Sequence, residues 1–259
     1  MLANEMRNLF VLQYEKINAN DAPGLQDGEI SLFLTKAQQE LAYKIIRRVA
    51  NPIKEGLEET ELRKQGLANL IEDSDDPNSS GVTLLPASPA NFPNGRFWQL
   101  PDNFWFTITD SAYTDVVDCT TDLPNLEAFV KVVTHNELKN NKYNPYRKPL
   151  LEGDQCFVWR IEYEREDTGY DMLNATTQDI SPPRHELITD GTFNVTTYKI
   201  RYIRYPRPIV VDRTTPANQK NSELNPMLHE AIVEQAVQLA GIALREQLPQ
   251  GQQNMVNLQ

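Results

Sequence analysis

Apolar residues recur at three- and four-residue steps near both ends of the chain, which predicts helices there. One helix is expected over residues 4–20, and a second over 28–49, where Thr35 and Gln38 could form a capping box if the helix restarts. A third, mostly charged helix is expected over 56–73, although Gly66 weakens it. The expected inward positions are Leu9, Phe10, Leu12, Tyr14 and Ile17 in the first helix, Phe33, Leu34, Ala37, Leu41, Ile45 and Val49 in the second, and Leu62, Leu67, Leu70 and Ile71 in the third.

A fourth helix, over residues 225–246, carries strong helix signals. Asn225 is a favourable N-cap, and Pro226 stands at the first helical position, where its missing N–H costs nothing. The apolar stripe is wider than the roughly one-third of the circumference that a surface helix usually hides, which suggests contacts on two sides. The simplest interpretation is a core helix of its own domain. Contact with a helix of another subunit is a second interpretation, which adds to the first.

Alternation of apolar and polar residues predicts strands in the middle of the chain. These strands are expected over residues 104–109, 129–133, 156–164, 185–190 and 197–211, with a short helix after Pro101 as the alternative for the first. The alternation in 156–164 predicts a strand with one buried face. The last two strands are expected to form a hairpin around Asp190 and Gly191, with Pro206 and Pro208 placing the end of the second at a sheet edge.

The centre of the chain also contains one expected helix start and three tryptophans. Thr134 and Glu137 fit a capping box, which makes His135 an exposed helix-start residue. The tryptophans fall on alternating or half-buried patterns and are expected in the core: Trp98, Trp105 and Trp159.

Together these elements predict an α+β fold, in which the N-terminal helices and the C-terminal helix form a helical bundle around the ends of the chain. A central β-rich insertion, an antiparallel sheet or sandwich-like structure, is expected between them. The predicted parts are residues 1–75, 76–215 and 216–259, the last packing back on the first. The segment before Pro23 and the tail after Gln247 read as arms that order on a partner, with Met255, Val256 and Leu258 as anchors of the tail or as part of a frayed terminus.

Charge and composition restrict the function. The 259 residues carry a formal net charge of −11, which argues against a protein that grips phosphates, apart from a local cluster of Lys139, Lys142, Arg147 and Lys148 that reads as a solvated loop. Two cysteines stand in no metal or redox spacing, and the apolar runs fall short of the roughly 20 residues of a membrane span. The polar, charged start of the sequence is unlike a secretion signal, so the chain is expected to be made and kept in the cytoplasm until assembly.

Candidate chemistry is sparse. His229 and Glu230 begin a zinc-peptidase motif, but Val233 occupies the position of the required second histidine. The nucleophile elbow, the phosphate-binding loop and the dinucleotide-binding turn have no match in the sequence. We therefore expect no catalytic residue, no metal and no cofactor.

Six segments, taken in order, resemble a known family: APGLQDGEISLFLTKAQQELAYKIIRR, LEETELRKQGLANLIED, QLPDNFWFTITDSAY, VTHNELKNNKYNPYRKP, RYPRPIVV and ELNPMLHEAIVEQAVQLA. They resemble the head-to-tail connector proteins, also called ring or tail-adaptor proteins, of crAss-like tailed bacteriophages, over roughly residues 22–244. The resemblance implies a structural virion protein at the head–tail vertex, assembled in the host bacterial cytoplasm. It implies a ring of twelve copies in contact with the portal and other connector rings, with double-stranded DNA passing through the lumen without specific binding. It implies no membrane contact.

A ring requires one surface of each copy to meet a different surface of the next. The residues expected at such subunit or portal interfaces are Leu9, Phe10, Leu228, Ile232, Val233, Ala236, Leu239, Ala240, Met255, Val256 and Leu258. Two other functions stay open at this point. One is a receptor- or glycan-binding tail component that uses its tryptophans as exposed platforms, and the other is a hydrolase or metal enzyme.

Overall fold

The computed structural model describes residues 1–17, 24–46, 65–75, 81–84, 92, 94–117, 122–141, 144, 147–152, 155–163 and 183–247. The fold is α+β, as expected, with a β-rich centre between helical ends. The chain divides into two compact units, residues 1–70 with 205–259 (unit 1) and residues 71–204 (unit 2). The boundaries predicted from the sequence are 75/76 and 215/216.

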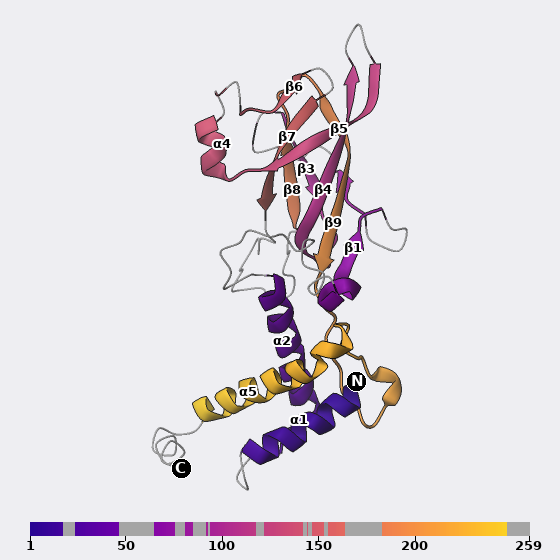
Figure 1. Ribbon diagram of the computed structural model, residues 1–259, viewed down its shortest axis with the longest axis vertical. Helices are drawn as coiled ribbons and strands as arrows, with labels where there is room; N and C mark the ends of the chain where they lie inside the picture. Colours follow the sequence, from indigo (N-terminus) through magenta and orange to yellow (C-terminus); the bar gives the residue numbers. More distant parts are fainter. Residues whose placement is uncertain are drawn as a thin grey trace, which may run out of the picture. The chain divides into compact units, whose positions relative to one another are not determined.

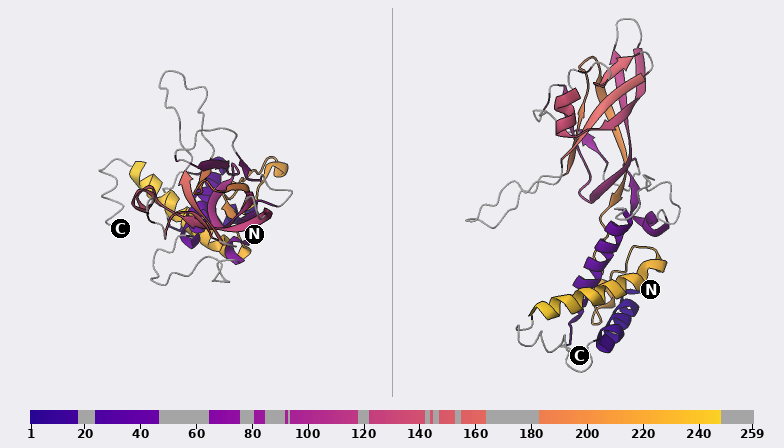
Figure 2. Two further views of the ribbon diagram at one scale, coloured as in Figure 1. Left: turned by 90° about the horizontal axis from the view of Figure 1, so that it is seen from above. Right: turned by 60° about the vertical axis from the view of Figure 1, so that its left-hand side comes forward.

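Unit 1 contains the long helices, α1 (Ala3–Ile17), α2 (Asp27–Ile46) and α5 (His229–Gln247). Helix α5 packs against both α1 and α2, and Figures 1 and 2 show it crossing α2. The buried residues are spaced three or four positions apart, as an amphipathic helix requires, and include Met6, Phe10 and Tyr14 on α1, Ile30, Leu34 and Ala37 on α2, and Ile232, Val233, Ala236, Val237 and Ala240 on α5. Leu12, which we expected to face inward, is 50% exposed.

The segment that follows the sheet lies along α2 and is bonded to it by side chains. The Thr35 hydroxyl accepts a hydrogen bond from the N–H of Ile209 at 3.1 Å. Gln38 is fully buried, donates to the carbonyl of Arg207 at 2.8 Å, and accepts from the Ser222 hydroxyl at 2.6 Å. The predicted capping box at Thr35 and Gln38 is therefore wrong. Helix α2 does not restart there, and both side chains satisfy backbone groups of the returning segment instead.

The beginning of α5 agrees with the sequence analysis. The Asn225 side chain accepts a hydrogen bond from the N–H of Met227, with Pro226 at the first position of a 3₁₀ turn, η4 (Pro226–Leu228), that leads into α5. The expected third helix is wrong at its end: a short 3₁₀ turn, η2 (Ala68–Leu70), is followed by strand β1 (Ile71–Asp73). Residues 56–64 of that prediction lie outside the described part of the chain.

Unit 2 is one curled sheet with the strand order β1-β9-β4-β5-β7-β8-β3-β2, and β6 pairs with β7 beside this path (Figure 1). The strands not yet given are β2 (Thr83–Leu84), β3 (Gly95–Gln99), β4 (Phe104–Val117), β5 (Asp122–Val132), β6 (Leu150–Glu152), β7 (Gln155–Tyr163), β8 (Arg184–Ile188) and β9 (Asn194–Arg204). A short helix, α4 (His135–Asn141), connects β5 to β6. Its Thr134–Glu137 capping box is confirmed, because the Thr134 N–H donates to Glu137 at 2.9 Å and the Glu137 N–H donates to the Thr134 hydroxyl at 3.2 Å.

Three strand predictions need correction. The sheet is mixed, because β5 and β7 pair in parallel, with Phe129 opposite Phe157, on either side of α4. Strands β8 and β9 do not form a hairpin, since β8 pairs with β3 and β7 whereas β9 pairs with β1 and β4. Strand β9 is also not at an edge, and it ends at Arg204, before Pro206.

The inward face of the curl holds the main core of unit 2, which includes Trp98, Ala112, Cys156, Val158, Leu187, Tyr198, Ile200 and Tyr202. A second apolar cluster lies on the other face of β7, where Trp159 and Ile161 pack with Leu138 of α4. Strand β7 is therefore buried on both faces over much of its length, not on one as predicted. Trp98 and Trp159 are 3% and 4% exposed, so the prediction that they are core residues is confirmed, while Trp105 is half-buried.

Candidate functional site

The expected interface residues of unit 1 fall into two groups. Phe10, Ile232, Val233, Ala236 and Ala240 are fully buried in the helices' own core and offer no surface to a partner. Their burial supports the simpler of the two interpretations of α5, a core helix. The partly exposed members are Leu9, Leu228 and Leu239, and the anchors Met255, Val256 and Leu258 lie outside the described residues.

The long helices of unit 1 also expose large apolar side chains. Leu12 on α1 and Leu32 on α2 are 50% and 55% exposed, and Met227 in η4 and Ile242 on α5 are 77% and 56% exposed. Single exposed apolar residues are common on soluble proteins, so they mark a possible contact surface and no specific site.

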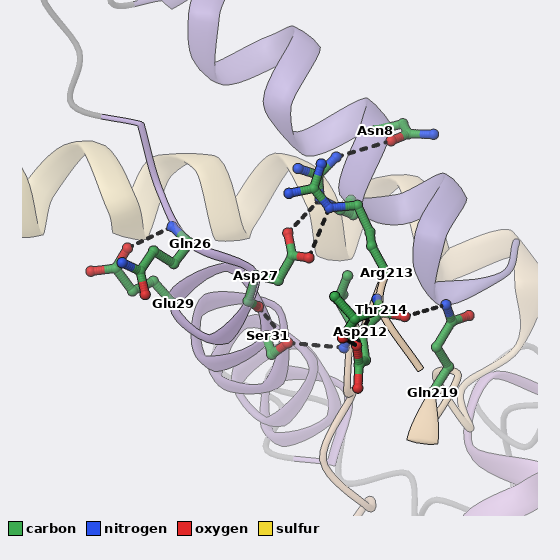
Figure 3. Close-up of polar contacts among 11 residues, drawn as sticks. Asn8, Gln26, Asp27, Glu29, Ser31, Asp212, Arg213, Thr214 and Gln219 are labelled. Carbon is green, nitrogen blue, oxygen red and sulfur yellow. Dashed lines mark hydrogen bonds and ion pairs between the residues drawn. The ribbon is translucent and has the colours of Figure 1, made fainter. Parts of the chain in front are cut away.

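A polar cluster around Asp27 ties three parts of unit 1 together (Figure 3). Asp27 opens α2, and its carboxylate accepts from Arg7 of α1 at 2.8 Å and from Arg213, after the sheet, at 2.9 Å. Burial raises the pKa of this carboxyl, but the hydrogen bonds and charges of Arg7 and Arg213 outweigh it and hold the pKa below its ordinary value. Its charge also lies at the positive end of α2. The cluster fixes helix positions and presents no reactive group.

Two adjacent contacts extend this cluster. The Ser31 hydroxyl accepts from the N–H of Val211 at 2.9 Å, one turn along α2. Asp212 accepts from the Thr214 hydroxyl at 2.6 Å and from the backbone N–H groups of Thr214 and Thr215, both at 2.9 Å, which closes the turn after the segment. The Thr214 hydroxyl and these N–H groups lower the pKa of Asp212. The segment is therefore an ordered part of unit 1.

The buried charges of unit 2 centre on Arg160. Its side chain is 5% exposed and pairs with Asp110 of β4 at 2.7 Å and with Glu162 of its own strand at 2.6 Å. Asp110 is 13% exposed and Glu162 52% exposed, so the Asp110 pair is the desolvated one. Because β4 and β7 are not neighbours in the sheet, this ion pair joins two strands that share no backbone ladder.

His185 and Tyr198 complete this network. The Tyr198 hydroxyl donates to Asp110 at 3.1 Å and lies 2.8 Å from Nδ1 of His185, which fits a neutral imidazole donating from Nδ1 to Tyr198. Burial and the charge of Arg160 push the pKa of His185 well below its usual value, and burial together with Asp110 raises the pKa of Tyr198. Both side chains therefore remain neutral near pH 7. The arrangement is a structural network in which only Nε of Arg160 is buried without a hydrogen-bond partner.

A hollow of about 270 Å³ lies over β1, β4 and β9. Its charged residues pair with one another, as Lys199 does with Asp75 at 2.8 Å and Arg201 with Asp73 at 3.6 Å. Over the described ranges, no three His, Cys, Asp or Glu side chains come together in a way that could hold a metal ion. His229 uses both ring nitrogens within unit 1, with Nε2 3.0 Å from the Leu224 carbonyl and Nδ1 3.0 Å from the amino group of Met1.

Comparison with known proteins gives a consistent result along the whole chain. The family model described as phage tail ring protein 3/4 matches residues 1–252. The chain is 26% identical over 259 residues to "Ring protein 4/5" of Bacteroides phage crAss001, covering 96% of this chain and 95% of that protein. It is 30% identical over 229 residues to "Ring protein 3" of the same phage, covering 85% and 86%. The chain belongs to the phage tail ring protein 3/4 family.

Membership in the tail ring family confirms the resemblance seen in the sequence. None of the helices in the described part of this ring-family chain is both long enough and apolar enough to cross a membrane.

Sequence reasoning missed the Arg160–Asp110 pair of this ring-family protein. Arg160 was placed on the polar side of a half-buried strand, although Val158 on the same side was a signal that this face is also buried. It also missed Asp27, which reads locally as an ordinary acidic residue near a helix start. Its two arginine partners are 20 and 186 residues away, and nothing local in the sequence points to them.

Proposed function

We propose that this chain is a structural component of a crAss-like phage virion that assembles into a homo-oligomeric ring at the portal–tail junction, through which DNA passes. The observation that carries the proposal is the match to two ring proteins of one phage over at least 85% of this chain. A similarity that spans nearly the whole of both proteins supports a shared architecture, and not a single borrowed domain.

The proposed ring consists of twelve copies and contacts the portal and other ring proteins of the tail. The chain matches two differently named rings of one virion, which supports a stack in which related rings lie next to one another. The partly exposed Leu9, Leu228 and Leu239, and the C-terminal anchors Met255, Val256 and Leu258, remain our proposed contacts with neighbouring subunits or with the portal.

The net charge of −11 per copy supports a passive channel. Duplex DNA carries one negative charge per about 1.7 Å, so a lumen of the same sign lets it slide without binding. The alternative function of a glycan- or receptor-binding component loses support because Trp98 and Trp159 are buried and cannot serve as stacking platforms.

The test is cryo-electron microscopy of the virion, with fitting of the chain into the density at the head–tail vertex. The proposal predicts a closed ring of this chain around the DNA channel. Density for this chain at the distal tail tip, or its absence from the virion, would rule the proposal out.

A further inference from the structure

The outer face of strand β7 carries apolar side chains, and the neighbouring strand β5 adds Phe129 to it, while α4 covers one end of the face. On β7 this face presents Phe157, Trp159 and Ile161, since Cys156 and Val158 point to the core on the other side. Leu138 of α4 packs over Trp159 and Ile161, in the second cluster of unit 2. Phe157 lies beyond this cover.

The uncovered end of the face holds a pair of aromatic rings. Phe129 of β5 lies opposite Phe157 in the parallel ladder, and their rings stack with centroids 5.6 Å apart and an interplanar angle of 26°. Phe129 is 64% exposed and Phe157 39% exposed, and Leu150 of β6 stands opposite Phe157 on its other side. We call Phe129, Phe157 and Leu150 the aromatic patch. Exposed aromatic residues grouped in this way are typical of the centre of a protein interface.

Exposed basic residues flank the aromatic patch. Lys131 follows Phe129 on the same face of β5, and the exposed Glu127 precedes it there. Lys139 is on α4, and Arg147 and Lys148 lead into β6. Residues 131–148 contain five basic residues and one acidic residue, whereas the rest of unit 2 contains seven basic and twenty acidic residues. The single acid, Glu137, caps α4 through Thr134. Positive charge is therefore concentrated beside the patch, in a unit that is otherwise strongly acidic.

We infer that the aromatic patch with its basic flank is the docking face for a second copy of this chain, an inference that rests on the proposed ring. Charge complementarity selects this occupant, because a chain of net charge −11 offers acidic surface to an incoming basic face. Pairing of two such faces would bring their lysines and arginines together, which is unfavourable. The charges therefore favour contact with a different surface of the next copy, which is the head-to-tail contact that closes a ring.

Duplex DNA is the other polyanion that the basic flank could attract. Phosphate binding uses basic and hydrogen-bonding groups and gains nothing from an exposed stacked phenylalanine pair. The acidic remainder of the chain also repels DNA at long range. The aromatic patch thus favours a protein partner, and DNA binding becomes an outcome of the test.

The test measures self-association of the full chain by analytical ultracentrifugation and native mass spectrometry, at low and high salt. Phe129→Ser with Phe157→Ser is expected to weaken assembly about tenfold or more, because buried aromatic anchors carry most of an interface's binding energy. Lys131→Glu with Lys148→Glu is expected to weaken it at low salt and less at high salt, where charges are screened. Lys36→Glu on α2, partly exposed and with the same charge change per site, is the control and should leave assembly within about twofold of wild type.

Tryptophan fluorescence and thermal melting establish that each variant folds, which is expected because every substituted side chain is at least partly exposed. If both double variants assemble as the wild type does, the inference about the docking face is wrong and the proposed ring is unaffected. A wild-type chain that stays monomeric contradicts the proposed ring itself. If the lysine substitutions abolish binding to a fluorescent 30-base-pair duplex and leave self-association unchanged, the face binds DNA and the inference is wrong.

Discussion

Arg160 pairs with two carboxylates that differ in burial. Replacing each in turn therefore measures how burial changes the contribution of an ion pair to the free energy of unfolding. The Asp110 side chain is 13% exposed and that of Glu162 is 52% exposed, at 2.7 and 2.6 Å from the same guanidinium. Removing one partner of a buried pair costs about 3–5 kcal/mol, whereas exposed pairs contribute about 0.2–1 kcal/mol. We expect Asp110→Asn to lower the free energy of unfolding by about 3 kcal/mol, at the lower end because Asn still accepts from Tyr198. Glu162→Gln is expected to cost less than about 1 kcal/mol.

The assay is urea unfolding followed by tryptophan fluorescence, which reports on unit 2 because all three tryptophans of the chain lie between residues 71 and 204. The double variant Asp110→Leu with Arg160→Met removes the whole pair, so no charge is left buried without a partner. Its loss in free energy of unfolding should be smaller, by about 2 kcal/mol, than the summed losses of Asp110→Leu and Arg160→Met made singly. Equal effects of Asp110→Asn and Glu162→Gln, or single costs that simply add, would refute this reasoning.

Three further results are expected. Asp27→Asn should lower the free energy of unfolding of unit 1 by about 1–2 kcal/mol, because it removes the mostly buried pair with Arg7 and the more exposed pair with Arg213. Unfolding followed by helical circular dichroism measures this, and an unchanged helical transition would contradict it. Burial and the charge of Arg160 hold the pKa of folded His185 well below its ordinary value, while the unfolded chain takes up a proton. Stability should therefore fall as pH drops below 6.5, and His185→Gln should flatten that slope in urea titrations. Gly191→Ala should lower the melting temperature of unit 2, because Gly191 has φ +93° and a Cβ there would lie 2.7 Å from Asn94; a melt identical to wild type would argue against that backbone conformation.

The local elements of this fold could be predicted from sequence because their determinants are local. The Asn225 cap, the Thr134–Glu137 capping box and the amphipathic spacing of the long helices depend on residues within a few positions of each other. The same holds for the strand that contains Trp159. Its length and place follow from alternation and β-forming residues.

The pairing of distant strands could not be predicted in this way. Strand β8 pairs with β7, which precedes it in the chain, but its other neighbour is the distant strand β3 and not the next strand, β9. The turn at Gly191 suggested a hairpin, but it connects two strands that lie apart in the sheet. Gln38 resembles a capping residue until the returning segment provides the Arg207 carbonyl and the Ser222 hydroxyl as partners.

The candidate contact surfaces also depend on contacts between distant residues. Helical periodicity identifies apolar residues, but an apolar residue type does not by itself separate Ile232, which is fully buried, from Ile242, which is 56% exposed. The aromatic patch could not be predicted from the sequence either, because Phe129 and Phe157 each fit an ordinary alternating strand. Only the parallel register brings them together on an uncovered face.

Native mass spectrometry and negative-stain electron microscopy of the purified full-length chain test directly whether this protein functions by assembling with copies of itself. We predict closed annular particles whose mass is twelve times the 29.6 kDa of one chain. A protein that remains a 29.6 kDa monomer at every concentration, with no annular particles in the images, would contradict that prediction.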